Sequence, residues 1–247
     1  MSRITWDERG KHLFETGVSR GVLYLLEANG RYGTGQAWNG LTAVNESPSG
    51  GESTPIFADN RKYANYITEE NYVATIEAYD YPNDFNLCLG RIELAAGVTI
   101  EQQNRKRFGF CYQTKVGNDL EGIHYQYLIH IIYNCVAGLT EISHNTMAES
   151  PEPTVYSWEI NADKIIEGDF TPTASLTLDR KQFSEAGILN AFRKLESILY
   201  GTDTEDPRLP TFAEIFNVLG TSHYLQDSDG NDILDCQGYQ IQTLVFD

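Results

Sequence analysis

The stretch from residue 108 to residue 133 constrains the fold of this chain more than any other part of its sequence. Apolar and polar residues alternate along two runs, and a polar turn at residues 117–122 separates the runs. Side chains on a β-strand point alternately to opposite faces, so this pattern is typical of strands that bury one face. The sequence therefore predicts an antiparallel hairpin at the centre of a mainly β fold.

The polar face of this hairpin is the first candidate functional surface. His124 and His130 share one strand face, but six residues at ~3.3 Å each place them about 20 Å apart, too far to share a metal ion. The face carries no catalytic constellation, so we interpret it as one wall of a larger structure. The candidate wall residues are Gln113, Lys115, His124, Gln126 and His130.

The charge of the chain limits its partners. Its 18 Lys and Arg residues against 35 Asp and Glu residues give a formal net charge of −17. Such a surface repels nucleic acid and anionic lipid, so specific DNA binding is not expected. A passage through which DNA slides without sticking suits this charge.

Cysteine usage and hydropathy indicate where such a chain assembles. Its four cysteines are scattered, without a CxxC pair, which predicts free thiols in a reducing compartment. The sequence has no apolar leader and no apolar run of membrane length. We therefore expect assembly in a cytoplasm and no membrane partner.

Elsewhere the patterns predict further strands, two helices and an arm. Residues 1–16 are polar and charged, typical of an arm that a partner must order. Residues 184–219 show helical spacing, with Gly201 after the first helix and a capping box of Thr211 and Glu214 before the second. Residues 221–247 end in a strand pattern and are expected to add a strand or hairpin to the domain formed by residues 1–220. The other predicted strands are residues 17–27, 33–46, 53–68, 71–80, 154–162 and 174–180.

Two short segments are candidate contacts between subunits. One is a loop rich in Ser, Gly and Pro, whose composition fits either a solvated hairpin tip or an assembly contact. The other is the densest basic cluster, which fits either a solvated strand start or a contact with an acidic neighbouring subunit. The loop comprises Ser47, Pro48, Ser49, Gly50, Gly51, Glu52 and Ser53, and the cluster comprises Arg105, Lys106 and Arg107.

The sequence contains no motif that indicates catalysis. No nucleophile elbow, P-loop, HExxH motif or complete dinucleotide fingerprint occurs. The acidic run at residues 227–232 has its glycine too early for a calcium loop and no closing glutamate, which favours a hairpin turn. We therefore expect no enzymatic activity, no cofactor and no bound metal.

Several segments, in their order along the chain, resemble the major tail proteins, or tail tube subunits, of long-tailed, non-contractile bacteriophages, particularly those of phages that infect Gram-positive bacteria. The resemblance extends over roughly residues 4–219, and the residues after 220 depart from the shorter family members. It is carried by ITWDERGKHLFETGVSRGVLY, AWNGLTAVNESPSGGESTPIFADNRKY, TIEAYDYPNDF, GVTIEQQNRKRFGFCYQTKVGND, HYQYLIHIIYN, ASLTLDR, LESILYGTD and LPTFAEI.

The resemblance implies a β-sandwich or partial barrel flanked by α-helices, of which six copies form a ring. Stacked rings then make a hollow tube that conducts the phage genome. A barrel wide enough for duplex DNA needs on the order of twenty strands, more than one chain supplies. Sharing the barrel among six subunits leaves no open sheet edge. On this interpretation the central hairpin and the strands around residues 37–44 and 56–67 supply each subunit's share.

The resemblance also implies partners and a location. The partners are other copies of the chain, the tape measure, terminator and distal tail proteins, and phage DNA that passes through the lumen without specific binding. The location is the tail tube of the virion. By analogy, the loop at residues 47–53 and the N-terminal arm contact the next ring.

Two alternatives stay open at this point. One is the inner tube of a contractile tail, tailocin or secretion apparatus, which uses the same subunit design and differs in having a sheath partner. The other is a carbohydrate-binding or carbohydrate-cleaving β-sandwich, which needs aromatic platforms and a carboxylate pair in one groove. Trp6, Trp38 and Trp158 are spread along the chain and do not suggest such a platform.

Overall fold

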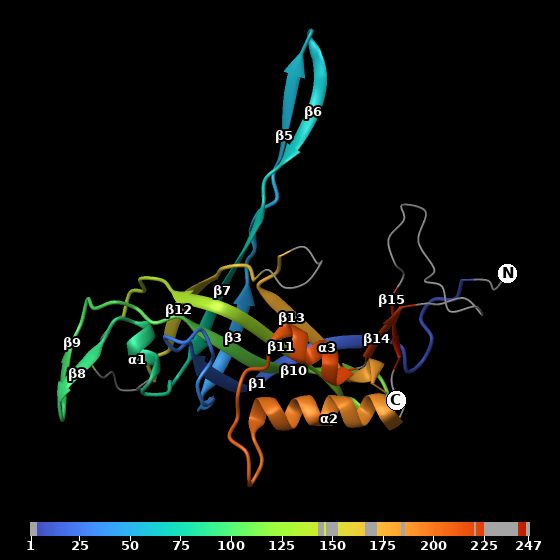
Figure 1. The fold of residues 1–247 in the computed structure, drawn as a ribbon. Helices are drawn as coiled ribbons and strands as arrows, with labels where there is room; N and C mark the ends of the chain where they lie inside the picture. The colour runs from blue at the N-terminus through green and yellow to red at the C-terminus, as the bar shows by residue number, and fades with distance from the viewer. Residues whose placement is uncertain are drawn as a thin grey trace.

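A computed structural model describes residues 4–142, 146, 153–165, 172–183, 186–219, 221–224 and 242–245. Its main element is an antiparallel sheet of nine strands, which confirms a mainly β fold of the partial-barrel or sandwich type (Figure 1). The strands are β1 (Leu13–Leu25), β2 (Gln36–Trp38), β3 (Leu41–Glu46), β4 (Ser49–Gly50), β7 (Glu70–Ala78), β10 (Phe108–Asn118), β11 (Gly122–Ala137), β12 (Tyr156–Ala162) and β13 (Ser175–Asp179). They are ordered β2-β1-β10-β11-β12-β7-β3, with β13 beside β11 and β4 beside β7.

Three smaller strand pairs and three α-helices complete the described elements. The pairs are β5 (Ser53–Ala58) with β6 (Arg61–Ile67), β8 (Ile92–Ala95) with β9 (Val98–Ile100), and β14 (Thr221–Tyr224) with β15 (Gln242–Val245). The helices are α1 (Phe85–Cys88), α2 (Ala186–Tyr200) and α3 (Phe212–Leu219), and a short 3₁₀ helix spans Arg180–Gln182.

The predicted central hairpin is present as β10 and β11, but both faces of its base are buried. Phe110 and Ile132 face a core enclosed by the curled sheet, whereas Cys111 and Ile131 face a second core under the helices. We expected one buried face. Alternation in the sequence shows which residues share a face of a strand. It does not show that a helix covers the second face, because the hydroxyl and thiol side chains there are compatible with either a covered or an open face.

The first core lies inside the curled sheet and is built from aromatic side chains. The Trp38 ring centroid lies 4.5 Å from that of Phe85, 5.3 Å from that of Phe110 and 5.6 Å from that of Trp158. Phe85 reaches this cluster from the one-turn helix α1. Aromatic side chains bury large areas, so this cluster is the main source of stability inside the sheet.

The second core lies between the sheet and the helices α2 and α3. Phe192, Leu195 and Leu199 form the buried face of α2, as their helical spacing predicts. Gly201 ends this helix with a φ of +77°, and Thr211 begins α3 by accepting a hydrogen bond from the Glu214 backbone N–H at 3.2 Å. Both predicted helix boundaries are therefore confirmed.

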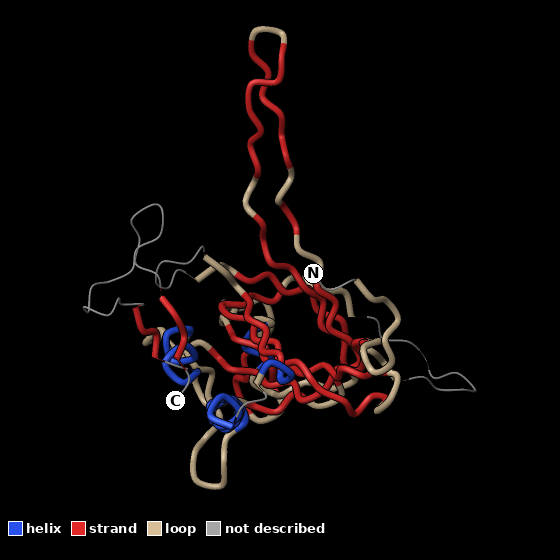
Figure 2. Tube along the Cα trace, turned by 90° about the vertical axis from the view of Figure 1, so that its right-hand side faces the viewer, coloured by secondary structure: helices blue, strands red, loops and turns tan. Residues whose placement is uncertain are grey.

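Residues 53–68, predicted as one strand, instead form the β5–β6 hairpin. Asp59 and Asn60 both have positive φ, at 50° and 64°, which suits the tight turn of a two-residue hairpin loop. The loop at residues 47–53 lies at the base of this hairpin and not at its tip, because β4 pairs with Asn71 and Glu70 of β7. Residues 47–69 thus form one long two-stranded projection that stands away from the body (Figures 1 and 2).

The N-terminal arm is shorter than predicted and partly anchored on its own chain. β1 begins at Leu13, inside the segment assigned to the arm. The Gly10 backbone N–H donates to both carboxylate oxygens of Asp119, at 2.9 and 3.0 Å, and this contact holds the pKa of the Asp119 carboxyl below its usual value. Ile4 and Trp6 remain 70% and 76% exposed.

The described cysteines agree with the prediction of free thiols. Cys88, Cys111 and Cys135 are buried and unpaired, and burial raises the pKa of the Cys88 and Cys111 thiols to about 12. Cys236 and the hairpin turn predicted at residues 227–232 lie outside the described residues. Among the described helices, none combines the length and the apolar character that crossing a bilayer requires.

Candidate functional site

Four strands form an open wall at one end of the sheet. In spatial order they are the first half of β1, then β10, β11 and β13. At residues 13–19, β1 pairs with β10 alone, and β13 pairs with β11 alone among the described strands. Both edges of this four-stranded segment therefore present unpaired backbone groups, which invite pairing with another chain.

The register between β10 and β11 decides which side chains face outward on this wall. Tyr112 pairs with His130 and Val116 with Gln126, so these residues share the face opposite the helices. Gln113 pairs with Ile129, and Lys115 pairs with Tyr127, on the face that α2 covers.

The prediction that the five candidate residues share one polar face is therefore wrong in part. Gln113 and Lys115 lie on the helix side of the sheet, and Gln113 is only 7% exposed. Gln126 and His130 lie on the open side. His124, two residues before Gln126, is exposed on the same open side. Periodicity fixes the parity within each strand but not the pairing between strands, and a shift of one residue exchanges the two faces.

The open face carries polar and acidic side chains. The Thr114 hydroxyl donates to Glu15 at 2.6 Å and lies 2.9 Å from His130 Nε2. On β13, Thr177 is exposed and pairs with His130, and Asp179 pairs with Leu128. The polar residues of this wall are Glu15, Thr114, His124, Gln126, His130, Thr177 and Asp179, and none of them is a Lys or Arg. Val116 and Leu128 lie on the same face.

A hydrogen-bonded cluster joins this wall to the base of the projection. Glu46, the last residue of β3, accepts hydrogen bonds from the Tyr72 hydroxyl at 2.7 Å and the Tyr112 hydroxyl at 2.8 Å. Tyr112 stacks on His130 with ring centroids 4.6 Å apart. Burial, and then the Glu46 carboxylate, raise the pKa of both tyrosines, whereas burial lowers the pKa of His130. The three groups are therefore held in their neutral forms around one carboxylate.

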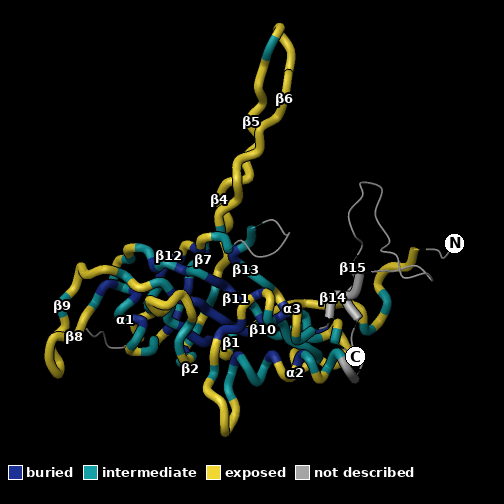
Figure 3. Tube along the Cα trace, in the orientation of Figure 1, coloured by how far each residue is buried: buried dark blue, intermediate teal, exposed yellow. Residues whose placement is uncertain are grey.

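The projection is exposed along nearly its whole length (Figure 3), and the register of its two strands places large apolar side chains on both of its faces. A two-stranded hairpin is marginally stable alone, and large apolar side chains in such density mark an interaction site. The projection is therefore a candidate contact surface. Its large exposed residues are Ile56, Phe57, Tyr63, Tyr66 and Ile67.

The basic cluster is largely used within the chain. Arg105 donates to the Ala137 carbonyl at 2.6 Å, and Arg107 donates to the Asn134 side chain at 3.0 Å and pairs with Asp163. Lys106 alone of the three is exposed. These contacts favour a structural role for the two arginines, and a contact with a neighbouring subunit stays a prediction for Lys106.

Sequence reasoning missed Glu15 and the projecting hairpin. Glu15 falls in the segment interpreted as an arm, although Leu13 and the alternating residues after it carry a weak strand signal. The Asp59-Asn60 dipeptide between two apolar runs was the available signal for the hairpin.

The features that a carbohydrate site requires do not gather on the described surface. Trp38 and Trp158 are 3% and 1% exposed and lie inside the first core, so neither can serve as a sugar-stacking platform. Within the described ranges, no three His, Cys, Asp or Glu side chains are grouped as metal ligands.

No protein-family model matches this sequence, and no curated protein matches it. Among solved structures, a chain of the anti-feeding prophage baseplate aligns with a TM-score of 0.33 at 10% identity, over 72% of this chain and 97% of that one. A chain of the sheath-tube complex of an extracellular contractile injection system in its extended state aligns with a TM-score of 0.28 at 11% identity, over 65% of this chain and 88% of that one. Likenesses at these TM-scores do not by themselves define a shared fold.

Proposed function

We propose that this chain is the subunit of a hollow tube in a phage tail or a tail-like particle, with no catalytic activity. Six copies form a ring, and each contributes one four-stranded segment to the wall of a central channel. The observation that carries the proposal is a sheet segment with two free edges, one face packed on helices and the other face polar.

The two free edges supply a means of closing the ring. Residues 13–19 of β1 in one copy lie at one edge, and β13 of the next copy lies at the opposite edge. Pairing them around a ring of six gives a barrel of about twenty-four strands, wide enough for duplex DNA. A closed ring also removes the exposed edges, which otherwise promote uncontrolled association.

The polar face suits the lining of a DNA channel. Glu15 and Asp179 give the wall negative charge, and its neutral polar groups carry no fixed positive charge to bind phosphates. Positively charged walls would hold DNA through counterion release, whereas an acidic wall lets it slide. On this basis the DNA is a passenger in the channel, and the setting is a phage tail, contractile or non-contractile.

Electron microscopy of the purified protein at high concentration tests this function. We expect rings or rods with a central hole, and we expect a variant with residues 49–68 replaced by a short Gly-Ser turn to remain folded and to form no long rods. Wild-type protein that stays monomeric at high concentration would reject the tube. Decoration of the rods by a sheath protein would assign the chain to a contractile particle instead.

A further inference from the structure

A row of polar side chains crosses all four strands of the open wall. The Thr114 hydroxyl on β10 donates to Glu15 on β1 at 2.6 Å, and its oxygen lies 2.9 Å from Nε2 of His130 on β11. Nδ1 of His130 lies 3.4 Å from the Thr177 hydroxyl on β13. The row therefore runs from one free edge of the wall to the other.

The residues at the two ends of this row can take a further partner. The Glu15 side chain is 50% exposed, and its contacts with Thr114 and His130 both use Oε1, which leaves Oε2 without a partner among the described residues. Thr177 is exposed, and 3.4 Å is long for a hydrogen bond. A carboxylate is a stronger acceptor than a neutral ring nitrogen, so the Thr177 hydroxyl can turn to a carboxylate brought within reach.

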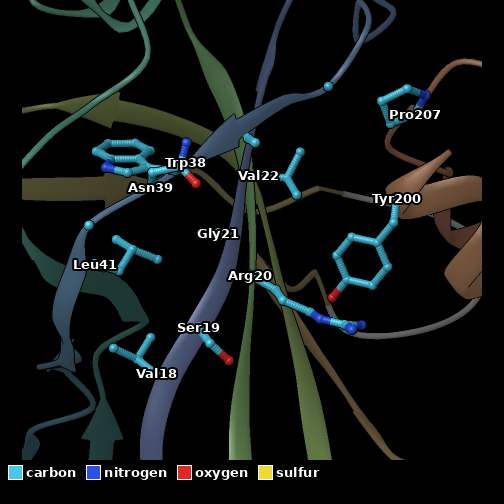
Figure 4. A pocket seen from close by; sticks show the side chains of 13 residues that line it. Val18, Ser19, Arg20, Gly21, Val22, Trp38, Asn39, Leu41, Tyr200 and Pro207 are labelled. Carbon is cyan, nitrogen blue, oxygen red and sulfur yellow. The ribbon is translucent and has the colours of Figure 1, made fainter.

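The free edge of β1 is short. β2 pairs with β1 from Gly21 onward, and Arg20, just before it, takes a φ of 52° within a register shift on β10. Figure 4 shows this boundary, where the Arg20 guanidinium lies 5.7 Å from the centre of the Tyr200 ring. Residues 13–19 are therefore the stretch of β1 along which β13 of a neighbouring copy can pair.

Strand direction and side-chain faces restrict how β13 pairs there. Each neighbouring pair in the order β1, β10, β11 and β13 is antiparallel, so β13 runs antiparallel to β1 of the next copy as well. Thr177 lies on the open face of the wall, so it meets an open-face residue of β1. These residues are Leu13, Glu15 and Val18, because Gly17 is an extra residue in a bulge.

We infer that Thr177 of one copy lies opposite Glu15 of the next copy and donates a hydrogen bond to its carboxylate. The inference rests on the proposed tube and names the contact that sets the register between neighbours in a ring. All five residues of β13 then pair within the free stretch of β1. On the helix side, Leu178 meets Phe14, which is 45% exposed in the single chain.

The other two registers are less favourable. With Thr177 opposite Val18, Asp179 lies opposite Glu15, and like charges directly opposite each other destabilise a strand pair. With Thr177 opposite Leu13, the last two residues of β13 extend beyond the start of β1 and lose their strand partners. Charge and strand length therefore select the same register.

Disulfide trapping reads this register directly. In a Cys236→Ser background, Glu15→Cys and Thr177→Cys place two thiols on each chain. Within one copy, β10 and β11 separate these positions by at least about 14 Å, whereas opposite residues of paired strands have Cα atoms about 4.5–5.5 Å apart, within reach of a disulfide. Oxidation of assembled protein should therefore link neighbouring copies into a ladder that ends at six.

The matched control pairs Glu15→Cys with Asp179→Cys, which links only in the register that places Thr177 opposite Val18. If this pair links and the first pair does not, the inferred register is wrong while the ring stands. If wild-type protein forms rings or rods but neither pair links, the inferred contact is not made. If wild-type protein forms neither rings nor rods, the proposed function itself fails.

A change of charge gives an independent readout. Thr177→Asp sets a carboxylate opposite Glu15 and should raise the concentration needed for ring assembly about tenfold or more, measured by sedimentation. Adding Glu15→Lys to this variant should restore assembly, because opposite charges then face each other. Ser175→Asp is the control, since it adds the same charge to the same strand face away from Glu15 and should have a smaller effect. Wild-type assembly by Thr177→Asp, or no recovery in the double variant, would overturn the inference.

Discussion

The body and the projection of this protein are stabilised in opposite ways. The body has two cores, one inside the curled sheet and one beneath α2 and α3, and its central strand β10 is buried on both faces. In the projection, nearly every residue of β4, β5 and β6 is exposed, and its contacts are made between its own two strands. The difference shows that one part of the chain is stabilised by its own cores, whereas the other leaves its side chains exposed, as the proposed tube requires of a segment that a neighbouring copy covers.

The largest effect expected from this comparison comes from Trp158→Ala. Trp158 is 1% exposed and packs on Trp38 and Phe85, so its removal leaves a cavity and should lower the free energy of unfolding by about 3–5 kcal/mol. Phe57→Ala is the matched change in the projection, and it should alter the free energy of unfolding by less than about 0.5 kcal/mol. Denaturant unfolding of dilute protein measures both. Equal losses in the two variants would remove the distinction between body and projection.

A smaller effect is expected where the two regions join. Tyr112→Phe removes the hydroxyl that donates to Glu46 and leaves this carboxylate with one tyrosine donor fewer. Hydrogen bonds to charged groups contribute roughly 1.5–3 kcal/mol, and we expect a loss in that range by the same unfolding measurement. Tyr63→Phe removes a hydroxyl from the exposed projection and serves as the control. An unchanged free energy of unfolding for Tyr112→Phe would show that the joint is not held by this bond.

His130 should make the stability of the body depend on pH. Burial holds its pKa below the usual value of 6.5 even though Glu46 and Glu15 act to raise it, so the folded protein favours the neutral ring. The contribution of the neutral His130 ring to the free energy of unfolding is complete above about pH 6.5. It is lost as the pH falls toward the lowered pKa of the folded protein, because the unfolded chain then binds the proton more readily. Unfolding measured from pH 8 to pH 5 should decline less steeply for His130→Gln than for the wild type.

The control for this titration is His124→Gln, since His124 lies on the same open wall but is exposed. It should keep the wild-type dependence on pH. If His124→Gln, and not His130→Gln, flattens the curve, the cluster at the base of the projection does not control this response.

The smallest effect on folding is expected at the tip of the projection. Asn60→Gly keeps the positive φ that this turn requires, at a residue type that adopts it without strain. The free energy of unfolding should change by less than about 0.5 kcal/mol, because the tip contributes nothing to either core. A large loss would mean that the projection folds as part of the body.

The sequence predicts the individual strands and helices better than it predicts how the strands pair and which faces are covered. The periods of 2.0 and 3.6 residues located β10, β11 and α2, and Gly201 and Thr211 marked helix boundaries, because these signals act within a few residues. The wall was predicted only in part, since the pairing of Tyr112 with His130 and of Gln113 with Ile129 depends on strand register. The projection was missed because Phe57, Tyr63 and Ile67 resemble core residues until their surroundings are known.

Hydrogen exchange on dilute and concentrated protein tests the central claim most directly, namely that neighbouring copies complete the free edges and the projection. In dilute protein, the amides of residues 53–67 and of β13 should exchange quickly and those of Phe108–Cys111 slowly. On assembly, the first two groups should become protected while the core amides stay as they were. Protection of the projection that is already complete in the monomer, or that does not change in assembled rods, would contradict the account.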